Sequence, residues 1–199
     1  MSARDDILQA VRRAVATAAE APGQPARVAG RSAGHDLLEL FTERVEDYRA
    51  TVTHCRPDQV ADTLADALAG SGSTLVPDGF PWEVPNAVAD SGQSPAALDR
   101  IPAVVTTATV GIAETGTIVL THGPGEGRRA LSLVPDLHVC LVRADQVVPD
   151  VPDAIDRLDP RRPQTWISGP SATSDIELNR VEGVHGPRTL HVILVEPDR

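Results

Sequence analysis

The stretch Leu137-His138-Val139-Cys140-Leu141-Val142 decides the fold class. It is short, and apolar side chains occupy both faces of the strand that it predicts, which is typical of a strand buried in a parallel sheet. Helices are predicted between such strands, the first of them opened by Pro57 and closed by Gly70. This alternation predicts one α/β domain with a mainly parallel sheet and helices on both faces.

The other predicted elements follow the same alternation along the chain. Strands are predicted at Thr51–Cys55, residues 73–76, Ala103–Thr107, residues 111–113, Thr117–Leu120, Thr165–Ile167 and Thr189–Val195. Short helices are predicted around residues 95–100 and 149–158.

Two amphipathic helices precede this alternation. Ser2 and Asp5 resemble a capping box, and apolar residues then recur at helical spacing through residue 19. Proline and glycine are frequent in residues 20–34, which predicts a flexible linker. A second helix is predicted over residues 35–50. We therefore divide the chain into residues 1–34, a helix with its linker, and residues 35–199, the α/β domain.

Charge and composition exclude several functional classes. The 199 residues carry a formal net charge of −10, which disfavours nucleic acid as a partner because phosphates require a positive surface. All 18 basic residues are arginine, so neither a Schiff-base lysine nor a P-loop lysine is present. We find no apolar run that could span a bilayer and no signal-peptide core after Met1, and we expect a cytoplasmic protein.

Metal and cofactor sites are not predicted. Cys55 and Cys140 are the two cysteines, too few for a zinc or iron–sulfur site built by this chain alone. His138 and Cys140 share one face of their strand, which is compatible with a metal pair. A buried histidine and a small apolar cysteine are the simpler interpretation. We therefore expect this chain to bind no metal and no cofactor.

The loop of residues 122–129 is the first candidate anion site. Gly125 and Gly127 let the backbone approach a ligand, and Arg128 or Arg129 could pair with its negative charge. The loop is not a dinucleotide fingerprint, because Arg128 stands where the third glycine belongs. A mobile glycine loop without a ligand is the alternative.

The loop of residues 168–177 is the second candidate. Gly169, Ser171 and Thr173 offer hydroxyls and backbone amides suited to phosphate or carboxylate, while Asp175 or Glu177 could hold a ribose hydroxyl or a metal. A capped loop with solvated acids is the alternative.

Two residues are candidates for catalysis. His185 stands in a predicted tight loop before the last strand, where it could act as acid, base or ligand, or cap a carbonyl. Glu114 opens a turn between two strands. Together with Thr115, Gly116 and Thr117 it could belong to the anion site, although these residue types also suit an ordinary hairpin.

Several of these motifs together resemble the LUD-domain family. The resemblance is carried by Ile112-Ala113-Glu114-Thr115-Gly116-Thr117-Ile118-Val119-Leu120, by residues 123–138, 169–177 and 183–187, and by the earlier residues 41–50. It implies a fold like that of the NagB/RpiA/CoA-transferase-like superfamily. It also implies a role in the bacterial oxidation of L-lactate to pyruvate, alongside two larger partners that carry iron–sulfur clusters. Some enzymes of that superfamily use a glutamate on a loop after a strand, which makes Glu114 a candidate.

Three functions are therefore compared. The first is an accessory or substrate-handling subunit of the lactate oxidation system, with redox centres supplied by the iron–sulfur partners. The second is a stand-alone enzyme or binding protein for a phosphorylated or CoA-linked small acid. The third is a structural scaffold.

The two candidate loops and the turn at Glu114 are expected to meet beyond the carboxyl ends of the strands, where α/β sheets bind ligands. A small carboxylate would there contact Arg128 or Arg129 and the hydroxyls of Ser171 and Thr173.

Overall fold

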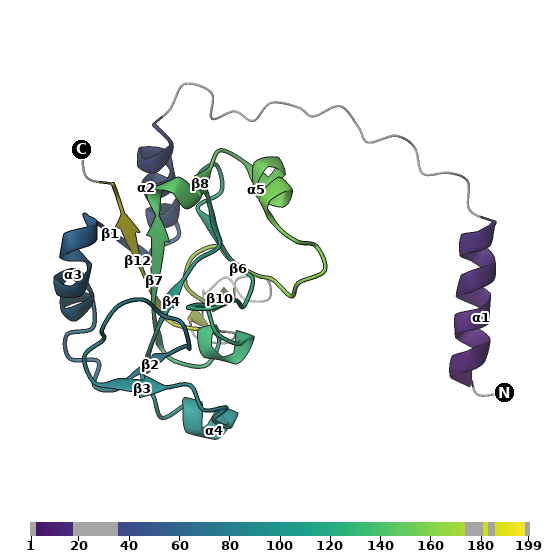
Figure 1. Ribbon diagram of the computed structural model, residues 1–199, viewed down its shortest axis with the longest axis horizontal. Helices are drawn as coiled ribbons and strands as arrows, with labels where there is room; N and C mark the ends of the chain where they lie inside the picture. Colours follow the sequence, from purple (N-terminus) through teal and green to yellow (C-terminus); the bar gives the residue numbers. More distant parts are fainter. Residues whose placement is uncertain (1–2, 18–35, 174–180, 183–185, 198–199) are drawn as a thin grey trace.

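A six-stranded parallel sheet forms the centre of the molecule (Figure 1). Its strands, in spatial order, are β1 (Thr51–Cys55), β12 (Thr189–Val195), β7 (Leu137–Arg143), β4 (Ala103–Thr107), β2 (Thr74–Val76) and β3 (Ala87–Ala89). Every pair of neighbours runs parallel. The computed structural model describes residues 3–17, 36–173, 181–182 and 186–197. The α/β class with a mainly parallel sheet and N-terminal helices is confirmed, and the more specific likeness to the NagB/RpiA superfamily stays an expectation.

The helices and turns stand close to the positions that the sequence predicts. They are α1 (Ala3–Ala16), α2 (Leu37–Asp47), α3 (Val60–Ala67), α4 (Pro95–Leu98) and α5 (Val151–Arg157), with 3-10 turns η1 (Pro57–Gln59), η2 (Arg129–Ser132) and η3 (Ala144–Gln146).

A second sheet was not predicted. It contains β8 (Val147–Val148), β5 (Val110–Ile112), β6 (Thr117–Leu120) and β9 (Thr165–Ile167) in that spatial order. β5 and β6 form an antiparallel hairpin, and β9 pairs antiparallel with β6. Three of these strands were predicted, but a buried apolar strand has the same pattern in either sheet. A short antiparallel pair, β10 (Ala172–Thr173) and β11 (Val181–Glu182), completes the strands described.

The two faces of β7 are covered by different layers. Val139 and Leu141 pack with α3, and Figure 1 shows α3 on one side of the central sheet. Cys140 and Val142 face the other way, into a core with Phe41 of α2 and with the hairpin strand β6. The hairpin and α2 thus form a second layer over the sheet, and the space between the two layers can hold a site.

The N-terminal helices differ in how they are anchored. α2 begins at Asp36, whose carboxylate accepts hydrogen bonds from the Leu38 and Glu39 amides at 2.9 and 3.3 Å. No residue of α1 is buried. The predicted linker, residues 20–34, lies outside the described residues, so the division of the chain at residue 34 stays a prediction. Within the part of the chain that the structure describes, no helix is both long and apolar enough to cross a membrane.

Gly116 fixes the hairpin against α2. Its φ is +57°, and a Cβ there would lie 2.5 Å from the carbonyl carbon of Arg44. Gly70 has a φ of +79° but no atom within 4 Å of its Cβ position. An alanine at either glycine would therefore strain the backbone, but only at Gly116 would its Cβ also collide with α2.

We expect Gly70→Ala to cost about 1–2 kcal/mol of unfolding free energy, from backbone strain alone. Gly116→Ala should cost a further ~1–3 kcal/mol, because α2 must move away from the hairpin. Urea unfolding of both variants measures the difference. Equal losses would show that α2 does not rest on this turn.

Candidate functional site

A cavity of about 310 Å³ lies at the amino ends of β7 and β12, and we call it the amino-end cavity. One wall is His138 of β7 with Leu190 of β12, and the other is β9 with the residues that follow it. Its polar lining is Arg129, Ser132, His138, Thr165, Ser168 and Ser171. The cavity therefore gathers hydroxyl groups, one imidazole and one guanidinium at the seam between the two layers.

His138 is buried at the wall of this cavity. Its Nε2 lies 2.8 Å from Oγ1 of Thr106, on the neighbouring strand β4. Burial lowers the pKa of His138 to about 4, so the ring is neutral at pH 7. Within the described residues, no partner is found for its other ring nitrogen, Nδ1. A neutral imidazole with one nitrogen available can bind a ligand hydroxyl or carbonyl.

Cys140 lies behind His138 on the same face of β7, as the alternation of the strand predicts. Burial raises the pKa of its thiol to about 12, although Thr106 Oγ1, 3.5 Å from Sγ, acts in the opposite direction. The thiol is therefore not ionised at neutral pH, and it is not a nucleophile. Its part is to fill the core and to contact the threonine that orients His138.

Hydroxyl groups connect the predicted turn to the cavity. Thr117 Oγ1 lies 2.8 Å from Oγ of Ser168 and 2.8 Å from Oγ1 of Thr115. The loop after β9 is held against β12, because the Ser171 amide donates to the carbonyl of Pro187 at 2.8 Å. These contacts fix the polar side of the cavity to both layers.

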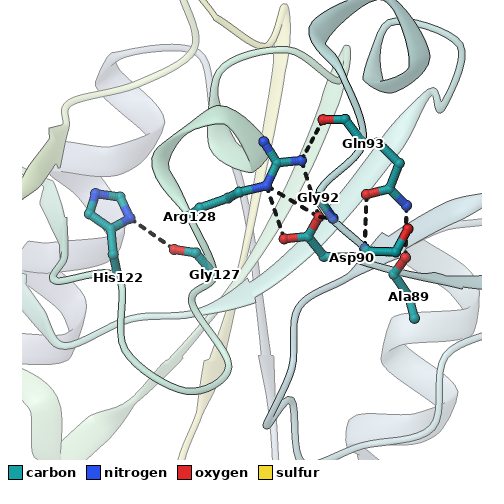
Figure 2. A network of polar contacts seen from close by, with 8 residues as sticks. Ala89, Asp90, Gly92, Gln93, His122, Gly127 and Arg128 are labelled. Carbon is teal, nitrogen blue, oxygen red and sulfur yellow. Dashed lines mark hydrogen bonds and ion pairs between the residues drawn. The ribbon is translucent and has the colours of Figure 1, made fainter.

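Arg129 and Arg128 are neighbours with different surroundings. Arg129 is exposed, lines the amino-end cavity and has no hydrogen bond or ion pair from its guanidinium to any described residue. The guanidinium of Arg128 instead binds Asp90, with Nε 3.2 and 3.1 Å from the two carboxylate oxygens (Figure 2). Its Nη2 also donates to the Gln93 carbonyl at 2.8 Å. Arg129 is therefore the arginine available to a ligand in the amino-end cavity.

The pKa of Asp90 reports the strength of this pairing. Burial by itself would raise the pKa of that carboxyl group, yet hydrogen bonds from Arg128 and from the Gly92 amide outweigh it, and the pKa is lowered. Arg128 thus ties the loop of residues 122–129 to the segment after β3.

Backbone amides of residues 122–129, the glycine loop, form hydrogen bonds within the chain. The Gly125 amide donates to the Asp78 carbonyl at 2.7 Å, and the Gly125 carbonyl accepts from the Thr107 amide at 2.8 Å. His122, at a φ of +59°, places Nδ1 2.9 Å from the Gly127 carbonyl (Figure 2). Its Nε2 lies 2.9 Å from Thr165 Oγ1. The amides of Gly125 and Gly127 are engaged within the chain, and they form no open cradle for an anion.

A second cavity of about 440 Å³, the carboxyl-end cavity, lies at the carboxyl ends of β4 and β7 in the central sheet. It is lined by Thr107 at the end of β4 and by Arg143 at the end of β7. Glu126 is buried beside it, and its carboxylate accepts from the Thr121 amide at 2.6 Å and from Thr109 Oγ1 at 2.5 Å. The glycine loop therefore contributes to both cavities, with Glu126 at the carboxyl-end cavity and Arg129 at the amino-end cavity.

The candidate residues of the sequence fall into four groups. Arg129, Gly169 and Ser171 share the amino-end cavity, and Thr115, Gly116 and Thr117 adjoin it through Ser168. Gly125 packs on Thr107 at the carboxyl end of β4, Gly127 packs on Leu131 and Pro77, and Arg128 is bound to Asp90. Glu114 lies in the hairpin turn and lines neither cavity, and Thr173 belongs to β10. Asp175, Glu177 and His185 lie outside the described residues, and their roles stay predictions.

The prediction that the candidate loops meet beyond the carboxyl ends of the strands is wrong for Arg129, Gly169 and Ser171, which line a cavity at the amino ends of β7 and β12. Arg129 lies in the segment that leads into β7, and the other two follow β9 of the separate sheet. His138 was considered, but the alternation of a strand shows only which face a residue occupies, not whether that end of the strand borders a cavity. Ser168 opened the second candidate loop, whereas Ser132 was not singled out, because nothing local in the sequence places it at a cavity.

Comparisons with known proteins give one consistent family. The LUD domain matches residues 71–195. The chain is 42% identical over 202 residues to Lactate utilization protein C of Deinococcus radiodurans, covering 97% of this chain and 95% of that protein. Proteins of the same name from Exiguobacterium sp. and Macrococcus caseolyticus are 34% and 25% identical over 186 residues each. The Exiguobacterium alignment covers 80% of this chain and 78% of the relative, and the Macrococcus alignment 81% and 78%.

A solved structure shares the fold. The crystal structure of a DUF162 family protein from Deinococcus radiodurans matches with a TM-score of 0.70 and 38% identity, covering 80% of this chain and 96% of that chain.

Arg128→Ala and Arg129→Ala separate a structural arginine from a binding one. Arg128→Ala leaves the mostly buried Asp90 carboxylate without its cation, and we expect a loss of about 1–3 kcal/mol in unfolding free energy. Arg129→Ala removes no hydrogen bond or ion pair to a described residue and should stay within about 0.5 kcal/mol of the parent. Urea unfolding gives both values, and equal stabilities would contradict the assignment.

His138 makes stability depend on pH with a defined sign. As the pH falls below about 6.5, His138 becomes protonated in the unfolded chain, whereas in the folded protein it stays neutral until about pH 4. The unfolding free energy should be unaffected above this window and fall within it by up to ~1.4 kcal/mol per pH unit.

His138→Gln should remove the contribution of His138 to the pH dependence of the unfolding free energy, measured by urea unfolding between about pH 4 and pH 6.5. Burial also lowers the pKa of His191, so His191→Gln is the matched control. This variant should retain the contribution of His138 to the pH dependence. An unchanged slope in His138→Gln would refute the buried neutral state.

Proposed function

This chain belongs to the LUD-domain family, and from that premise we propose that it is an accessory or substrate-handling subunit of a system that oxidises L-lactate to pyruvate. The names of its relatives from three bacteria support a role in lactate utilisation. In this proposal the chain works in the cytoplasm, and two larger iron–sulfur proteins receive the electrons.

The amino-end cavity is the proposed substrate site. The observation that carries this assignment is that Arg129 and the neutral ring of His138, neither fully partnered, line one cavity. A 2-hydroxy acid has a carboxylate and an adjacent hydroxyl. The guanidinium of Arg129 would bind the carboxylate, and His138 Nδ1 would bind the hydroxyl or, in the product, the keto oxygen.

The neutral state of His138 suits both substrate and product. A neutral imidazole has one donor and one acceptor nitrogen, and the tautomer follows from the direction of the hydrogen bond with Thr106. When Thr106 donates to Nε2, Nδ1 carries the proton and donates to a keto oxygen. When Nε2 donates to Thr106, Nδ1 accepts from a hydroxyl. The site therefore suits either oxidation state of the ligand, provided that the ring changes tautomer by exchanging its proton and the Thr106 hydroxyl rotates to match.

Growth on L-lactate tests this function. In the organism that encodes the chain, its deletion should abolish growth on L-lactate but not on glucose, and the parent gene should restore it. Arg129→Ala should restore growth poorly, because a charge-assisted contact of about 1.5–3 kcal/mol is lost. Arg100→Ala, an exposed arginine that lines neither cavity, is the matched control and should restore growth fully.

Other outcomes favour the other functions. Full growth with Arg129→Ala, at equal protein levels, would contradict the substrate site. Unimpaired growth of the deletion strain would contradict the role in lactate utilisation. Purified protein that turns over lactate with an artificial acceptor would identify a stand-alone enzyme instead of an accessory subunit.

A further inference from the structure

The carboxyl-end cavity takes no part in the proposed function. We propose that it binds a nucleoside phosphate, with the phosphate on the guanidinium groups of Arg143 and Arg162 and the base against Trp82. The cavity lies at the carboxyl ends of β4 and β7, where ligands bind in parallel α/β sheets. This site is separate from the amino-end cavity, which lies at the amino ends of β7 and β12, so that β7 borders one cavity at each end.

Arg162 is the first group that indicates an anion. Its guanidinium lies against the backbone of the glycine loop, since a Cβ on Gly123 would stand 3.3 Å from Nη2. No ion pair or hydrogen bond of this guanidinium to another described residue is found; the nearby Asp159 is hydrogen-bonded to Arg161, and Arg162 acts on its pKa through charge alone. In a chain with ten more acidic than basic residues, an arginine beside a cavity without a bonded carboxylate favours an external anion.

Arg143 is the second cation at this cavity. Its Nε and Nη2 donate to the two carboxylate oxygens of Asp145 at 3.0 and 3.2 Å, but the two side chains are 55% and 71% exposed. An ion pair so exposed contributes little, so a phosphate can replace the carboxylate at small cost. The backbone is meanwhile fixed, because the Arg143 amide donates to Gln146 Oε1 at 2.8 Å, and Gln146 Nε2 donates to the Ala108 carbonyl at 2.6 Å.

Glu126 does not compete for these cations through hydrogen bonds. Besides the two short contacts described above, its carboxylate accepts from Thr121 Oγ1 and from the Gly123 amide, each at 3.4 Å. Oε1 is thus bonded by Thr109, between β4 and β5, and Oε2 by Thr121 and Gly123. Glu126 holds the loop in place, and the two arginines remain for the ligand.

Trp82 supplies a surface for a planar ring. Its indole is held by an edge-to-face contact with Phe80, at 5.5 Å between ring centroids and 66° between planes. Leu141 and Pro81 add apolar surface to the same cavity. A fixed aromatic ring beside arginine is the combination that binds nucleotide bases and phosphates together.

Size distinguishes this ligand from lactate. The cavity of about 440 Å³ falls within the range of roughly 300–1,000 Å³ that is usual for small-molecule sites. Lactate or a lone phosphate would leave most of it empty and would not contact Trp82 and both arginines at once. A nucleoside diphosphate has the ring, the length and the charge to do so.

The two tryptophans of the chain make the test specific. Trp82 lines the carboxyl-end cavity and Trp166 the amino-end cavity. In Trp166→Phe, Trp82 is the only indole, and ADP should change its fluorescence in a saturable way. Adenosine and pyrophosphate, titrated separately, should each bind more weakly than ADP, because each makes only part of the contacts.

Two adjacent arginines provide the matched pair of variants. In the Trp166→Phe background, Arg162→Ala should weaken ADP binding at least about tenfold, since a charge-assisted contact is lost. Arg161→Ala, whose 89% exposed side chain pairs with Asp159 and lines neither cavity, should leave the ADP affinity unchanged. Urea unfolding verifies that both variants fold.

Three results would overturn the proposal. They are the absence of a saturable signal with ADP, an equal loss of affinity in Arg161→Ala and Arg162→Ala, and pyrophosphate binding as tight as that of ADP.

Discussion

The burial of β7 on both faces is the constraint on which the rest of the structure depends. This strand is hydrogen-bonded to β4 on one side and β12 on the other, so only its two faces remain to be covered. Val139 and Leu141 require an apolar layer on one face and Cys140 and Val142 on the other. α3 meets the first need, and α2 with the β5–β6 hairpin meets the second. A protein with this strand must therefore build two layers around it.

The second layer, α2 with the β5–β6 hairpin and β9, forms the amino-end cavity together with the central sheet. His138, the second residue of β7, borders a cavity whose opposite wall is β9 of the second layer. The same burial that lowers the pKa of His138 keeps its ring uncharged. The core thus sets the chemistry of the site, through a strand whose next residue on that face, Cys140, is an inert part of the interior.

The sequence predicted the elements better than their assembly. The β7 stretch, the alternation after Thr51 and the Glu114 turn were all predicted, because hydrophobic period and turn residues are local properties. The separate sheet of the hairpin was not predicted, because partner choice depends on contacts distant in the chain. Arg128 and Arg129 show the same limit at the site. Only the fold reveals that the first meets Asp90 and the second a cavity.

The glycine loop explains how one short segment serves both edges of the sheet. Glu126 secures it near the ends of β4 and β7, and the Arg128–Asp90 pair secures its other end beside β3. Arg128 is itself the second anchor, and Arg129 follows it directly in η2. Arg129 is thereby committed to the amino ends of the strands and Gly123 to the Arg162 side, so that any ligand at either cavity meets a wall already in place. Such a wall spares a ligand the entropy of ordering a loop, which is the usual advantage of a preorganised site.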